Sequence, residues 1–179
     1  MYKISIIPEN SESIRTLNKE DEKYLKDVAQ KTWQFFKDYL TPENNYLIPD
    51  NYQEDRKEIV VPRTSSTNIG LSMLAVIASY DLGFEDLEST IDRLSNIINT
   101  VYELPKWNWH LYNWYNIKTK QPLIPRYVST VDSGNLVGYM YTARAFLEEV
   151  EEKGQKKNRP LFALTQMIEK TNFKVLYSE

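Results

Sequence analysis

Residues 66–105, "STNIGLSMLAVIASYDLGFEDLESTIDRLSNIINTVYELP", decide the fold class of this chain. Apolar residues recur every three to four positions on both sides of the link "GFED" at residues 83–86, which is the period of a helix with one buried face. Gly83 suits the position just after a helix end, and Pro105 cannot continue a helix. The stretch therefore predicts two helices joined by a short link, an antiparallel helical hairpin.

The same spacing of apolar residues predicts three more helices, over residues 18–40, 132–154 and 160–171. Asn18 is a suitable N-cap for the first of them, and apolar positions such as Leu25 then recur along one face of that helix. The fold class expected from the sequence is therefore all-α, built of antiparallel helical hairpins and without an internal repeat.

Length and composition limit the possible functions. With 179 residues the chain is expected to form one helical domain over residues 18–179, preceded by a loosely attached extended segment, residues 1–17. The absence of cysteine excludes disulfides, a thiolate zinc site and a cysteine nucleophile. A net charge of −3 with mixed signs argues against a nucleic-acid surface. The lack of cysteine fits a reducing compartment, so we expect the cytoplasm as location. No apolar run reaches the ~20 residues that span a bilayer.

Two connections between the predicted helices are long. Residues 41–65 and 104–131 each exceed the ~12 to 15 residues beyond which a loop without structure of its own is uncommon and often functional. Because consecutive helices are expected to run antiparallel, both connections should emerge at one pole of the domain. The second has room for a short β-hairpin near residues 109–128. That pole is the predicted functional face.

The second connection contains "NWHLYNWYN", residues 108–116, and the whole chain has 13 Tyr and 4 Trp. Aromatic rings among amide, hydroxyl and carboxylate groups suit a sugar, which has apolar C–H faces and a rim of hydroxyls. The alternative is that these aromatic residues pack inside the fold. Paired carboxylates are the only catalytic chemistry the sequence allows, because no nucleotide-binding loop or serine nucleophile motif occurs. Asp132 and Glu54 are the candidates, and no cofactor is expected.

Several candidates also have purely structural explanations. Asp132 could be the N-cap of the helix that follows it, and Ser66 or Thr67 could cap the helix of residues 66–82. His110 has no second histidine or cysteine beside which to bind a metal, so no metal site is predicted. The two arginines of the long connections, Arg63 and Arg126, could pair with carboxylates of those connections and brace them.

Four ordered segments carry a resemblance to a known family: "IPDNYQED" (48–55), "VPRTSSTNIGLSMLA" (61–75), "HLYNWYN" (110–116) and "PRYVSTVDSGNLVG" (125–138). They resemble the central glucoamylase-like region of the cyclic β-1,2-glucan synthases, although Ile48 and Ser66 stand where the family pattern has proline. Those proteins are large, membrane-associated and multi-domain, with a glycosyltransferase region. Their central region is associated with cyclisation by transglycosylation. The resemblance implies part of an (α/α)6 toroid whose substrate cleft lies at one end.

The resemblance and the long connections together give the expected site. Its substrate-binding residues would be Asn51, Gln53, Glu54, Arg63, Thr67, Asn68, Tyr112, Trp114, Arg126, Tyr127, Asp132 and Asn135. Tyr112 and Trp114 are the expected stacking faces for a glucan.

Five predicted helices make at most a sector of a toroid, so the chain is interpreted as a fragment of a larger multi-domain enzyme. On that interpretation it acts on β-linked glucans or oligosaccharides and is inactive in isolation. The alternative is a non-catalytic helical module for carbohydrate binding or assembly. Such a module would form homo-oligomers, dimerising through apolar surface left by the missing helices.

Overall fold

The computed structural model describes residues 17–57, 59–154 and 159–175. Apart from Leu17, the segment expected to be loosely attached lies outside these residues. No described helix is long and apolar enough to cross a membrane.

Helices make up most of the described chain. They are α1 (Lys19–Tyr39), α2 (Ser66–Asp81), α3 (Leu87–Glu103), α4 (Thr130–Glu152) and α5 (Arg159–Val175). All five predicted helices are thus confirmed, and none of their ends differs from the prediction by more than four residues. A single 3-10 turn, η1 (Pro42–Asn44), follows α1.

Side-chain caps start four of these helices. Asn18 caps α1 as predicted and accepts hydrogen bonds from the backbone N–H groups of Glu20 and Asp21 at 2.9 Å. The predicted caps of α2 and α4 were wrong. Ser65, not Ser66 or Thr67, caps α2, and Ser129, not Asp132, caps α4. In both cases an extended serine accepts from the N–H three residues on, so the predicted cap residues lie within the first turn of the helix.

Five short strands lie between the helices. They are β1 (Arg63–Thr64), β2 (Lys106–Trp107), β3 (His110–Leu111), β4 (Asn113–Asn116) and β5 (Pro122–Tyr127). One sheet has the antiparallel order β1-β4-β5, and β2 pairs with β3. The β4–β5 pair is the hairpin allowed near residues 109–128, so the all-α expectation is corrected to a mostly helical fold with two small sheets.

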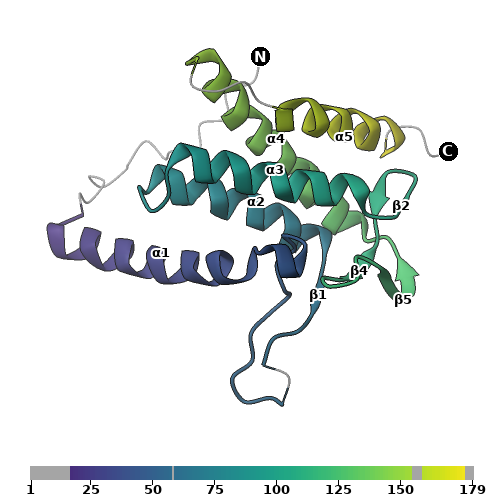
Figure 1. Ribbon diagram of the computed structural model, residues 1–179, viewed down its shortest axis with the longest axis horizontal. Helices are drawn as coiled ribbons and strands as arrows, with labels where there is room; N and C mark the ends of the chain where they lie inside the picture. Colours follow the sequence, from purple (N-terminus) through teal and green to yellow (C-terminus); the bar gives the residue numbers. More distant parts are fainter. Residues whose placement is uncertain (1–16, 58, 155–158, 176–179) are drawn as a thin grey trace, which may run out of the picture.

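The β1–β4 pairing joins the two long connections. Arg63 is opposite Asn116 and Thr64 is opposite Tyr115. In Figure 1, α1 and α3 end beside these strands, whereas α2 and α4 begin there. The expectation that both connections emerge at one pole is confirmed, and we call this end of the molecule the loop pole.

The helices pack around a core in which α2 is central. It contacts α1, α3 and α4, while α5 contacts α3 and α4. Met73, Leu94 and Met140 are among the core residues that are fully buried. The packing of α2 against α4 needs a glycine, because a Cβ atom at Gly70 would overlap the ring of Tyr139.

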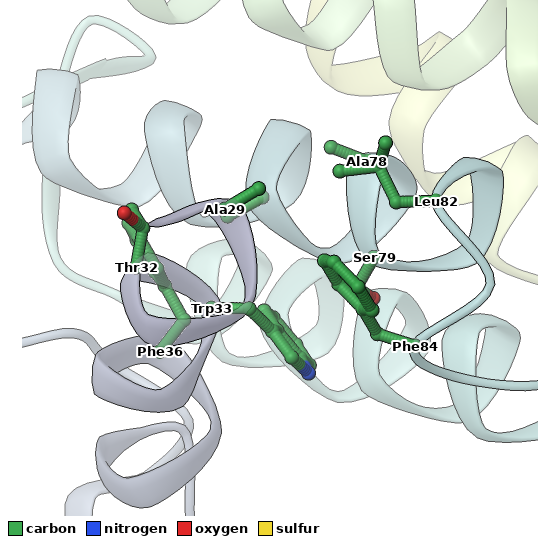
Figure 2. Close-up of a pocket in the computed structure, with 9 residues that line it drawn as sticks. Ala29, Thr32, Trp33, Phe36, Ala78, Ser79, Leu82 and Phe84 are labelled. Atoms are coloured by element: carbon green, nitrogen blue, oxygen red, sulfur yellow. The ribbon is translucent and has the colours of Figure 1, made fainter. Parts of the chain in front are cut away.

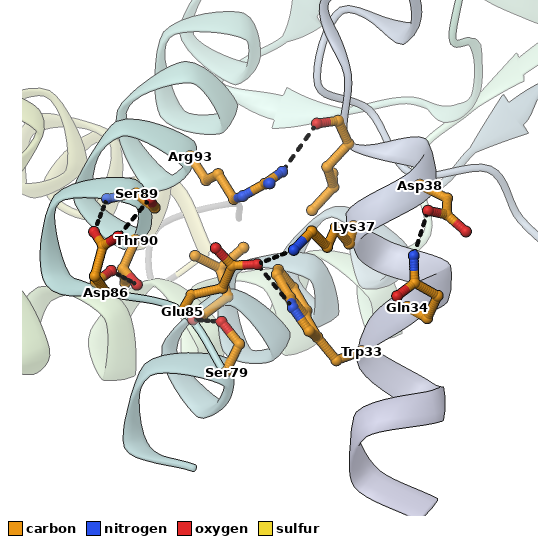
Figure 3. Close-up of polar contacts among 12 residues, drawn as sticks. Trp33, Gln34, Lys37, Asp38, Ser79, Glu85, Asp86, Ser89, Thr90 and Arg93 are labelled. Carbon is orange, nitrogen blue, oxygen red and sulfur yellow. Dashed lines mark hydrogen bonds and ion pairs between the residues drawn. The ribbon is translucent and has the colours of Figure 1, made fainter. Parts of the chain in front are cut away.

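Helix α1 is attached mainly through its second half. Trp33 is only 5% exposed, and its indole Nε1 donates to Glu85 at 3.2 Å. Lys37 forms an ion pair with the same carboxylate at 2.9 Å (Figure 3). Burial raises the pKa of Glu85, but the bonds from Lys37 and Trp33 outweigh burial and leave that pKa below its ordinary value. In the first half of α1, Leu25 is 50% exposed.

An apolar cavity of about 190 Å³ lies between α1 and the end of α2. Figure 2 shows the side chains that line it, among them Ala29, Thr32, Phe36, Leu82 and Phe84. All the lining residues come from α1, α2 and the link that follows α2, and none comes from the strands of the loop pole.

Candidate functional site

Polar side chains from both long connections gather at the loop pole, where α2 and α4 begin. Two carboxylates, Asp50 and Asp132, accept most of the hydrogen bonds in this cluster. Around each of them the donors come from more than one element of the fold, so each carboxylate links parts of the chain that are distant in sequence.

Asp50 connects the first long connection to α2. One oxygen accepts from Asn68 Nδ2 at 3.0 Å. The other accepts from Asn51 Nδ2 at 2.9 Å and from Arg63 Nη2 at 3.2 Å. The ion pair confirms the predicted pairing of Arg63 with a carboxylate, but both residues lie in the first long connection, so this pair does not itself hold the two connections together.

The guanidinium of Arg63 also covers the indole of Trp114, with 4.3 Å between its central carbon and the ring centre. Arg63 lies in β1 and Trp114 in β4, so this cation–π contact joins the two long connections. One face of Trp114, an expected stacking surface, is therefore occupied by a protein side chain.

Asp132 lies in the first turn of α4 and links three elements. It accepts from Asn113 Nδ2 of β4 at 3.3 Å. It also accepts from the hydroxyl of Ser129 and from both the hydroxyl and the backbone N–H of Thr67 in α2. Burial raises the pKa of Asp132, but these donors together hold it below its ordinary value. Asn135 Nδ2 in turn donates to Thr67 Oγ1 at 3.3 Å.

Further polar atoms at the same pole are buried. Within the described residues, five of them have no hydrogen-bond partner: Asn51 Oδ1, Thr64 Oγ1, Ser66 Oγ, Asn113 Oδ1 and Ser133 Oγ. Buried polar atoms are nearly always hydrogen-bonded, either to protein or to small polar molecules. The loop pole thus keeps hydrogen-bonding capacity beside its two carboxylates.

The aromatic stretch of residues 108–116 is partly structural. Tyr115 is fully buried, its hydroxyl donating to Pro105 O at 2.6 Å and accepting from Tyr112 N at 2.8 Å. The rings of Tyr112 and Tyr115 lie 6.5 Å apart, and Lys170 Nζ lies 4.1 Å from the ring centre of Trp109. Internal packing, the alternative explanation of this stretch, therefore accounts for much of it.

Two expected site residues lie toward the tip of a projecting arm. Residues 50–57 and 59–63 form the two sides of this arm, which are joined by a bridge between Tyr52 and Val60 and extend away from the helices (Figure 1). Gln53 and Glu54 are near its tip. Glu54 makes no hydrogen bond or ion pair with any described residue, and its side chain is exposed.

Arg126 does not act as the predicted second brace. It is exposed on β5, and no ion pair connects it to a carboxylate in the part of the chain that the structure describes. Its neighbour Tyr127 is directly opposite Asn113 in the β4–β5 register, which brings that tyrosine beside the Asp132 cluster.

The sequence reasoning missed two important residues. Asn113 was not among the candidates, although it connects β4 to Asp132; only its position between two aromatic residues could have marked it. Lys106 was also missed. Its Nζ donates to three carbonyl oxygens at the end of α3, those of Val101, Tyr102 and Leu104, at 2.6 to 2.9 Å. Burial lowers its pKa to about 8.

The described residues contain no group of three or more His, Asp or Glu side chains that could hold a metal ion.

The amino-acid sequence is similar to that of a known protein. Over 128 residues, 72% of its length, the chain is 41% identical to the cyclic β-(1,2)-glucan synthase NdvB of Rhizobium meliloti (strain 1021). The chain spans 4% of the length of that protein. No family model matches the chain. The resemblance expected from the four ordered segments is confirmed.

The fold is similar to solved structures of larger proteins. One is an endo-β-1,2-glucanase from Chitinophaga pinensis in complex with sophorotriose and glucose. The match covers 87% of this chain and 36% of the glucanase chain, with a TM-score of 0.66 and 15% identity. A proposed glucoamylase from Bacteroides fragilis matches 89% of this chain over 37% of its own length, with a TM-score of 0.66 and 18% identity. At these identities the likeness concerns the fold alone.

Proposed function

We propose that this chain, which is related to one region of the cyclic β-1,2-glucan synthases, binds a β-linked glucan at its loop pole as part of a carbohydrate-active enzyme. The relative is named for making a β-1,2-glucan, and one protein of similar fold is an endo-β-1,2-glucanase. Both names support a glucan as the substrate class.

The observation that carries the proposal is the polar cluster where α2 and α4 begin. Sugar hydroxyls both donate and accept, so they suit a surface that offers amides, hydroxyls and carboxylates at short spacing. Asn68, Thr67 and Asn135 supply the first two kinds of group, and Asp50 and Asp132 supply the third.

The reaction we propose is transfer or cleavage of β-linked glucosyl units, which needs a proton donor and a second carboxylate. Asp132 is a poor proton donor because its hydrogen bonds favour the ionised form. It fits the role of holding Thr67 and Asn113 in place. Of the two catalytic candidates, Glu54 is the one whose carboxylate has no described partner, so Glu54 is the proposed reacting group.

We propose further that the five helices form a sector of an (α/α)6 toroid within a larger multi-domain protein. The parallel pair α2 and α4, each beginning at the loop pole, supports this arrangement. So does the finding that the chain covers only 36 to 37% of two solved structures of similar fold. In that case the chain supplies one wall of a cleft and has little activity alone.

One observation favours a second function, a helical assembly module. Tyr24, Leu25 and Val28 leave an exposed apolar face on the first half of α1. Exposed apolar patches of this kind are typical of protein–protein contact sites. Under this alternative the chain would bind other helices, or a second copy of itself, rather than a sugar.

The two functions can be separated with the isolated chain. Titration with β-1,2-linked gluco-oligosaccharides, followed by isothermal calorimetry, should give a saturable signal if the loop pole binds glucan. A β-1,4-linked oligosaccharide of equal length is the control for linkage. A flat titration, together with self-association that rises with protein concentration in sedimentation velocity, would contradict glucan binding and favour the assembly module.

A further inference from the structure

The aromatic rings of the loop pole fall into two groups. Tyr112, Trp114 and Tyr115 are held by other side chains or by the backbone. Tyr52, Trp107 and Tyr127 are about half exposed, and their side chains make no hydrogen bond or ring contact with the described residues. A ring that stacks on a sugar needs a free face, and the three rings of the second group are the more exposed ones.

Trp114 is the ring that the sequence favours for stacking, and the structure gives it another role. Arg63 covers one of its faces, and that guanidinium is itself held by the ion pair with Asp50. Asp50 is in turn bonded to Asn68 of α2. Freeing the covered face of Trp114 would break this chain of contacts between the two connections, so Trp114 acts as a brace.

Tyr127 is the half-exposed ring whose partner in the strand register belongs to the polar cluster. Asn113, its partner in the β4–β5 register, donates to Asp132. Asp132 accepts from Thr67, which accepts from Asn135. A sugar lying on the Tyr127 ring would therefore have amide, hydroxyl and carboxylate groups along its rim.

The other two free rings are placed less well. Tyr52 lies on the projecting arm, where it is paired with Val60. Trp107 is in the separate β2–β3 pair, opposite His110. Neither ring has a register partner that is bonded to Asp50 or Asp132.

We propose that Tyr127 is the ring on which a glucosyl residue stacks, and that Trp114 positions the Arg63–Asp50 pair instead of touching the sugar. This assignment rests on the proposed function, because it requires that the loop pole bind a glucan. It differs from the expectation that Tyr112 and Trp114 are the stacking faces.

The test measures the affinity of the full chain for sophorotriose, a β-1,2-linked glucose trimer, by isothermal calorimetry. Tyr127→Ala should weaken binding about tenfold, the usual size of a lost stacking contact, and Tyr127→Phe should restore most of it because the ring remains. Trp114→Phe, which keeps a ring beneath Arg63, should lose far less than Tyr127→Ala. Tyr141→Ala is the control, since Tyr141 is similarly exposed but lies in the middle of α4, away from the loop pole.

The outcomes distinguish this inference from the function beneath it. If wild type binds and Tyr127→Ala binds equally well, or if Trp114→Phe loses the most affinity, the assignment of Tyr127 is wrong while glucan binding stands. If wild type does not bind sophorotriose, the proposed function fails and the stacking role fails with it. Should Tyr127→Ala not fold, as judged by its circular dichroism spectrum, Tyr127→Leu replaces it with the same expected loss.

Discussion

Tyr115 is a buried tyrosine whose hydroxyl makes two hydrogen bonds with the backbone of its own connection. Tyr115→Phe should lower the free energy of unfolding by about 1 to 3 kcal/mol, because Pro105 O and Tyr112 N would be left without their partner. Urea denaturation of both proteins measures the difference. An unchanged midpoint would show that these two backbone groups find other partners.

The same residue predicts a pH dependence. Burial raises the pKa of Tyr115, so the folded protein favours the neutral phenol. The stabilisation that this neutral phenol contributes is fully present below about pH 10, the pKa of tyrosine in the unfolded chain. It is lost as the pH rises above that value. Wild type should therefore lose stability between pH 10 and pH 11 more steeply than Tyr115→Phe. Parallel slopes would contradict this.

The pH dependence of stability that we expect from Asp132 has the opposite sign. Its folded pKa is lowered, so its stabilising effect is present above the unfolded value of about 3.9 and is lost as the pH falls through the folded pKa. Asp132→Asn should cost about 1 to 3 kcal/mol at neutral pH, since a charged acceptor for Thr67 and Asn113 is removed. The deficit should shrink in acid. Asp27→Asn, on the exposed face of α1, is the control for charge and should change stability by less than about 0.5 kcal/mol.

The contacts of single residues could be predicted where both partners are close in the sequence. The pairing of Arg63 followed from carboxylates close to it in the sequence. The contact between Thr67 and Asp132 did not, because it forms only when two helices from different hairpins lie side by side. The caps were misplaced for a simpler reason. "TSST" and "VSTVDS" each hold several residues that can cap a helix, and only the backbone conformation decides among them.

At the scale of elements, α2 and α4 each contain a glycine, and the same substitution at the two positions tests how closely these helices pack. Gly70→Ala should destabilise the protein by about 1 to 3 kcal/mol, because the added methyl group meets the ring of Tyr139. At Gly138 of α4 a Cβ would meet nothing, and Gly138→Ala should stabilise by up to about 1 kcal/mol through helix propensity alone. Thermal denaturation compares the two. Similar changes in both variants would mean that α2 and α4 can move apart.

The helices could be predicted from the sequence because each has enough turns for its apolar period to be recognised. The strands β1, β2 and β3 could not, since each has two residues and two residues show no alternation. The length of a helix also does not reveal how much of it packs. Leu25 fits the apolar face of α1, but the rest of the described chain does not reach it.

At the scale of the whole molecule, apolar surface remains exposed at both ends of the helical array. Leu25 and Val28 mark the α1 end, and Phe162 on α5 marks the other. The isolated chain should therefore self-associate as its concentration rises. The double variant Leu25→Gln with Val28→Gln should shift the sedimentation equilibrium of the chain toward the monomer, because both side chains are exposed. A wild-type chain that stays monomeric at its solubility limit would contradict this prediction.

The β1–β4 pairing has a kinetic consequence. It joins segments on either side of an entire helical hairpin, so closing it costs loop entropy that local helix contacts do not. The helices should then form first and the loop pole last, outside the folding transition state. Substitutions at Arg63 or Trp114 would accordingly speed unfolding and leave the refolding rate nearly unchanged. Such substitutions would shorten the lifetime of the assembled loop pole without slowing the assembly of the helices.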